Sequence, residues 1–160
     1  MTRSATGHAT FHSLEFAAQL VVWAMRKRLH LLRNGHDDSD VARAFALGRL
    51  DAVHAALMSL IDVLVCGSPK VIELHEVACP CLAPYEVALL NAIASLQNGR
   101  DAQAKNCIAT LLCRPALDLV FPGVQVMVRE LAARGLTIRP IANPLEPRHA
   151  LLQPSSRMLH

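Results

Sequence analysis

The chain has 160 residues, of which 52% are hydrophobic and 18% charged, and its formal net charge is +3. This length fits one domain with its own core, and so apolar a composition excludes a disordered chain. The weak positive charge lacks the basic stripe of a nucleic-acid-binding protein. The apolar runs are shorter than the roughly 20 residues of a membrane span, so we expect neither a nucleic-acid nor a membrane partner.

Hydrophobic periodicity predicts an all-α fold of about six or seven helices. The first helix begins near Ser13 and ends at Asn34, where Gly35 supplies a left-handed cap. Its cluster Arg26-Lys27-Arg28 is interpreted as a solvated helix end. The further helices are expected at 41–47, from Gly48-Arg49 to Cys66, and at 84–97, 102–112, 116–121 and 124–134, with Pro122-Gly123 separating the last two.

A weak internal repeat relates two of the predicted hairpins. Gly48-Arg49 matches Gly99-Arg100 at an offset of 51 residues, and apolar residues match after each turn. The pattern resembles the hairpins of superhelical repeat proteins, and any two helical hairpins with a glycine turn would produce it equally well. We expect hairpins over 41–66 and 84–113, packed as neighbours.

These elements predict one helical domain over 11–138, a compact bundle of αα-hairpins. The remaining residues, 139–160, contain Pro140, Pro144, Pro147 and Pro154 and cannot form a regular helix throughout. We expect an irregular tail that is either flexible or extended along a surface.

Five cysteines bear on the cellular compartment and on possible chemistry. An odd number in a chain of this length argues against a secreted disulfide framework. No apolar signal region follows Met1. We therefore expect a soluble cytoplasmic protein.

The segment from His75 to Cys81 is the candidate metal site. His75, Cys79 and Cys81 supply an imidazole and two thiols, which zinc prefers, with Cys113, Cys107 or His54 as a fourth ligand. The alternative is that both thiols are buried as small hydrophobic groups and that His75 makes an ordinary hydrogen bond. Burial is the more common situation for a free cysteine. Cys79-Pro80 also resembles the Cys-Pro dipeptide of haem-regulated proteins. A third possibility is a redox-sensing disulfide, either between Cys79 and Cys81 or with a distal cysteine.

No catalytic motif is present in the sequence. Phosphate-binding glycine loops, nucleophile elbows and zinc-protease helices are missing, so a non-catalytic role is favoured over an enzyme. The first helix is apolar on more than one face, and Phe16, Leu20 and Trp23 are the expected interface of a homodimer or of a complex with another protein. The leading hypothesis is a protein-interaction or regulatory module, and the alternative is a metal- or haem-responsive protein.

Overall fold

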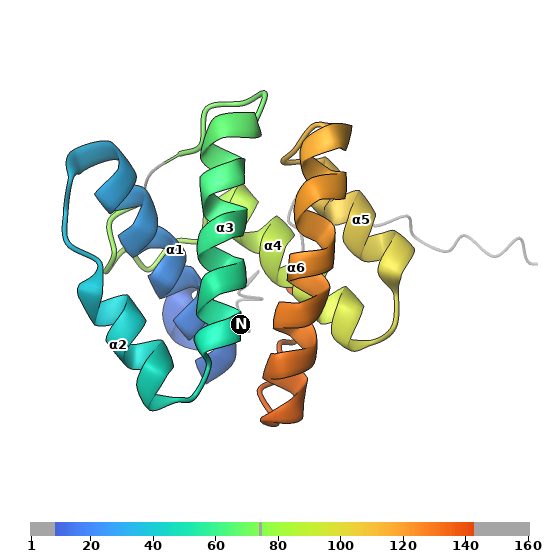
Figure 1. The fold of residues 1–160 in the computed structure, drawn as a ribbon, viewed down its shortest axis with the longest axis horizontal. Helices are drawn as coiled ribbons and strands as arrows, with labels where there is room; N and C mark the ends of the chain where they lie inside the picture. Colours follow the sequence, from blue (N-terminus) through green and yellow to red (C-terminus); the bar gives the residue numbers. More distant parts are fainter. Residues whose placement is uncertain (1–8, 74, 143–160) are drawn as a thin grey trace, which may run out of the picture.

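The structure is a computed structural model that describes residues 9–73 and 75–142. The described residues form a short 3-10 helix, Phe11–Ser13, and six α-helices without a strand, which confirms the all-α prediction (Figure 1). The helices are α1 Phe16–Asn34, α2 Ser39–Leu47, α3 Asp51–Gly67, α4 Pro84–Gln97, α5 Asp101–Ala109 and α6 Arg114–Ala133.

The helices α3 and α6 form the most extensive contact of the bundle and lie side by side in opposite directions (Figure 1). Gly67 at the end of α3 accordingly lies close to Ala116 in the first turn of α6. Helices α1 and α2 pack against α3, whereas α4 and α5 pack against each other and against α6. The pair α3 and α6 therefore joins the two halves of the bundle.

One hydrophobic core runs through all six helices. Its side chains from different helices meet closely: the void bounded by Met25, Leu60, Leu89 and Ile108 measures only about 10 Å³. A void of that size is at the lower limit for a single water. The core is thus closely packed, and the larger hollow described below is a feature of the surface.

The first helix begins later than predicted. Ser13 belongs to the 3-10 helix, where its hydroxyl accepts from the amide of Thr10 at 2.9 Å and donates to the Thr10 carbonyl at 2.8 Å. Leu14 and Glu15 are extended, and α1 starts at Phe16. Local side-chain bonds of serine compete with helix formation, which explains the extra turn.

The predicted break at Pro122-Gly123 is wrong, because α6 continues through it. Pro122 cannot donate to the carbonyl of Asp118, but both residues are exposed, so water can satisfy that carbonyl. The buried face continues across the proline, with Phe121 before it and Val124 after it. Packing of this face against α3 and α4 outweighs the local cost of the proline.

Both predicted hairpins form, as α2 with α3 and as α4 with α5. Their turns are equivalent at an offset of 50 residues, not 51. The left-handed residue is Arg49 (φ 53°) in the first turn and Gly99 (φ 69°) in the second. The amides that follow, Leu50 and Arg100, donate to the carbonyls of Phe45 and Ser95. The main helix contacts of each hairpin are with α6 rather than with the other hairpin.

The first residues of the predicted tail lie extended along α4. The amide of Ile141 donates to Asn91 Oδ1 at 2.7 Å, and Asn91 Nδ2 donates to the Ile141 carbonyl at 3.0 Å. Gln97 holds the segment in the same way, through the Ile138 amide and the Leu136 carbonyl, both at 2.8 Å. The prolines at 144, 147 and 154 lie outside the described residues.

Candidate functional site

One face of α1 holds the connection between α3 and α4, described over residues 68–73 and 75–83. Arg26, His30 and Arg33 follow one another at helical spacing, and each contacts main-chain carbonyls of this connection. His30 Nε2 lies 3.1 Å from the carbonyl oxygen of His75, and a guanidinium nitrogen of Arg33 donates to the carbonyl of Ile72. A segment without regular structure is thereby fixed by side chains from a helix.

Arg26 is the centre of this arrangement. Its side chain and that of Glu86 are both fully buried, and they form a two-pronged ion pair with Nε–Oε1 at 2.7 Å and Nη2–Oε2 at 2.9 Å. The remaining hydrogens of the guanidinium point at the connection, where Nη1 donates to the carbonyl of Cys79 at 2.7 Å and Nη2 to that of Cys81 at 2.6 Å. The other Nη1 hydrogen faces the carbonyls of Glu76 and Val77, each 3.3 Å away, so all five donors of the guanidinium are used.

The ion pair also shapes the electrostatics around it. Burial opposes the charge of Arg26, but the hydrogen bonds and charge of Glu86 outweigh it and raise the pKa of Arg26. Burial, and then the negative charge of Glu86, raise the pKa of Tyr85 far above its usual range, so this phenol stays neutral. Glu86 further accepts from the amide of Ala83 at 2.9 Å and so caps α4. The pair is a structural device that ties α1, α4 and the connection together.

The sequence interpretation of Arg26 as part of a solvated helix end is wrong, and Glu86 was not singled out as its partner. Arg28 of the same cluster is also paired, with Asp62 at 2.9 Å. The sequence did contain an indication that Arg26 is buried. Arg26 continues the buried row of Ala18 and Val22 at four-residue spacing. A charge in such a row is buried and requires a partner.

The sulfurs of Cys79 and Cys81 lie 3.2 Å apart. Cys81 is exposed and Cys79 is half-buried, so neither thiol has the deep burial expected of a packing residue. The hydrogen bond between the sulfurs, and then the charge of Cys79, raise the pKa of Cys81. The ring nitrogens of His75 contact groups other than the two thiols. Nδ1 lies 3.4 Å from the carbonyl oxygen of Cys81, and Nε2 lies 3.4 Å from a carboxylate oxygen of Glu73.

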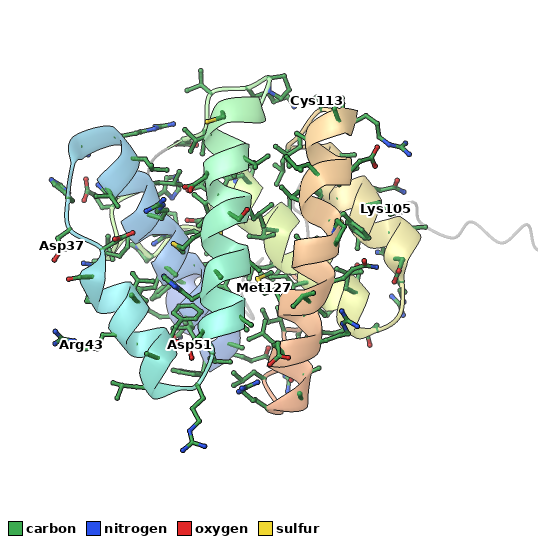
Figure 2. The ribbon with its side chains drawn as sticks, in the orientation of Figure 1. Asp37, Arg43, Asp51, Lys105, Cys113 and Met127 are labelled. Carbon is green, nitrogen blue, oxygen red and sulfur yellow. The ribbon has the colours of Figure 1, made fainter. Side chains whose placement is uncertain are left out.

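Within residues 9–73 and 75–142, no group of three or more His, Cys, Asp or Glu side chains is placed to hold a metal ion. The candidate fourth ligands lie on other elements: Cys113 is exposed just before α6, where Figure 2 labels it, Cys107 is on α5, and His54 is on α3 beside the ring of Phe45. Zinc or haem binding by His75, Cys79 and Cys81 stays a prediction, which elemental and absorption analysis of the purified protein would test.

A groove of about 950 Å³ lies along α4. Small and apolar side chains such as Ala88 and Leu111 line it together with amides such as Asn91, Gln103 and Asn106. Residues of α5, Leu64 near the end of α3, and two non-helical segments, 70–73 and 140–142, complete its lining. The charged residues among its lining are Lys70, Glu73 and Arg100.

The structure places the predicted interface residues on α1. Phe16 is 68% exposed, whereas Leu20 and Trp23 are partly buried and pack against the core. The three residues thus present one fully projecting ring and two partly covered side chains. The groove along α4 was not foreseen in the sequence, because it arises where segments that are distant in the chain meet.

Comparison of the chain with protein-family models, with curated proteins and with solved structures gave no match.

Proposed function

We propose that this protein is a non-catalytic interaction module that binds an extended segment of another protein in the groove along α4. The observation that carries the proposal is the way in which α4 holds residues 136–141. Asn91 and Gln97 each donate to a main-chain carbonyl and accept from a main-chain amide of that segment. This is sequence-independent recognition of an extended backbone.

The adjoining groove offers the same chemistry to a second segment. Gln103 and Asn106 line it with exposed amides that have no hydrogen-bond partner within the described part of the chain. Ala88 and Leu111 provide small apolar surface between them. Main-chain hydrogen bonds with pockets for alternate side chains are a common mode of peptide recognition.

The charges at the groove favour a segment that is neutral or mildly acidic, because Lys70 and Arg100 face only Glu73 as an opposing charge. In the described residues, no helix is both long and apolar enough to cross a bilayer. We propose that the protein acts in the cytoplasm. This compartment is reducing, so the protein's cysteines remain thiols for most of the time.

Photo-crosslinking from two adjacent positions tests the proposal. A photoreactive residue at position 103 lies in the groove, and the same residue at position 102, also on α5 and exposed, does not line it. We expect position 103, and not 102, to crosslink to one segment of a distinct protein in cells. A synthetic peptide of that segment should bind the purified full chain.

Two tryptophan variants complete the test. Ala88→Trp fills the groove and should abolish peptide binding, whereas Ala102→Trp should leave it unchanged. Crosslinks from position 103 to residues 143–160 of the same chain, or to a second copy, would contradict the proposal. Peptide binding that survives Ala88→Trp would contradict it as well.

A further inference from the structure

Two thiols meet at the surface turn formed by Cys79, Pro80 and Cys81. Their sulfurs are 3.2 Å apart, so a disulfide, with a bond of about 2.05 Å, requires the sulfurs to approach by only roughly 1 Å. Cysteines two residues apart reach this distance only when their side chains turn to the same side. The turn therefore presents a dithiol.

The main chain of the turn is held from the inside of the protein. The carbonyls of Cys79 and Cys81 accept from Arg26 at 2.7 and 2.6 Å, and the carbonyl of Pro80 accepts from the amide of Phe11 at 2.8 Å. Three consecutive peptide groups are thus fixed by buried or part-buried donors. The sulfurs remain on the outer side, where Cys81 is exposed.

These features distinguish the pair from cysteines that are buried as packing residues. Neither side chain is deeply buried, and the described residues bring no third metal-ligating group to the two sulfurs. A protein disulfide forms by exchange: a thiolate attacks an existing disulfide, and a second thiol resolves the mixed disulfide that results. A small disulfide can reach Cys81 directly.

We propose that Cys79 and Cys81 form a redox-active dithiol that undergoes thiol–disulfide exchange with a small-molecule disulfide such as oxidised glutathione. The thiolate of Cys81 attacks one sulfur of that disulfide, a mixed disulfide forms, and the first glutathione leaves as a thiolate. The thiolate of Cys79 then attacks the sulfur of Cys81 and releases the second glutathione. The two cysteines lose two protons and two electrons, and one oxidised glutathione becomes two reduced molecules.

Mass spectrometry of the purified full chain, incubated with oxidised glutathione, tests the proposal. The protein should lose the mass of two hydrogens, and peptide mapping should place the new bond between Cys79 and Cys81. Reduction with dithiothreitol should restore the original mass. Cys66→Ser, a change at another exposed cysteine, should leave this bond intact.

Single serine variants isolate the two steps. Cys79→Ser removes the resolving thiol and should retain one glutathione on Cys81, and Cys81→Ser should retain one on Cys79. Both side chains lie outside the core, so circular dichroism of the variants should match the wild type. A lasting glutathione adduct on either cysteine of the wild type, or a disulfide from Cys79 or Cys81 to Cys66, Cys107 or Cys113, would overturn the proposal.

Discussion

Arg26 shows how a single charged side chain can organise a connection that has no regular structure of its own. Its guanidinium forms a buried ion pair with the carboxylate of Glu86 and part-buried hydrogen bonds to the carbonyls of Cys79 and Cys81. Every buried side-chain nitrogen and oxygen of the described residues has a hydrogen-bond partner. Removal of Arg26 would leave a buried carboxylate and several carbonyls unpaired at once.

We therefore predict that Arg26→Met lowers the free energy of unfolding by about 3–5 kcal/mol, the cost of breaking a buried ion pair. Arg28→Met is the matched control, because the side chains of Arg28 and Asp62 are 23% and 44% exposed, and such a pair contributes less than about 1 kcal/mol. Urea denaturation of both variants measures the difference. Equal losses of stability in the two variants would show that the Arg26–Glu86 pair contributes no more than a surface pair.

A second prediction concerns the acidity of Cys81. The hydrogen bond and charge of Cys79 raise the pKa of Cys81, so less of it is thiolate at a given pH. In Cys79→Ala both influences disappear, and the pKa of Cys81 should fall. The pH dependence of alkylation by iodoacetamide, read at Cys81 by tandem mass spectrometry, should shift to lower pH. A midpoint that stays in place or rises would contradict this account.

At the scale of the helices, the turn after α4 depends on a residue with positive φ. Gly99 has φ +69°, a conformation that costs an L-residue energy, so Gly99→Ala should lower the free energy of unfolding by about 1 kcal/mol. Gly123 lies within α6, and a Cβ built there meets nothing within 4 Å. Gly123→Ala should therefore stabilise the protein by about 0.5–1 kcal/mol. Thermal denaturation in which both variants shift in the same direction would argue against this assignment.

Periodicity in the sequence was sufficient to predict most helices, because their buried faces repeat at helical spacing. The range 84–97 was predicted as observed for α4, and Gly35 was predicted as the left-handed cap of α1. Pro122 misled the prediction because its local cost is visible in the sequence, whereas the packing of α6 that outweighs it is not. The sequence pattern likewise aligned Gly48 with Gly99, whereas the left-handed residue of the first turn is Arg49.

The candidate site was less predictable, because it depends on contacts between distant residues. The cysteine turn was recognised from its composition, but the donors that hold it come from Arg26 and Phe11, more than 50 residues earlier in the chain. The groove along α4 combines residues from 64 to 142. No short motif marks such an arrangement, although the charge of Arg26 within an apolar row was a usable indication.

At the scale of the whole molecule, the two surface features lie on different helices and predict different behaviour. The groove lies between α4 and α5 and is lined by amides, whereas the exposed ring of Phe16 is at the start of α1. A groove of this kind suits a polypeptide segment. A projecting aromatic ring beside the partly buried Leu20 and Trp23 suits self-association, in which the same patch meets its copy.

We predict that the full chain forms a homodimer through Phe16, Leu20 and Trp23. Burial of a phenylalanine side chain contributes about 1.5–3 kcal/mol, so Phe16→Ser should weaken the dimer by at least about tenfold. Leu119→Ser is the matched control, because Leu119 is 72% exposed and belongs to a different helix, α6. Sedimentation velocity over a range of concentrations measures both. A wild-type protein that stays monomeric at all concentrations, or a dimer that dissociates with Leu119→Ser and not with Phe16→Ser, would rule out this interface.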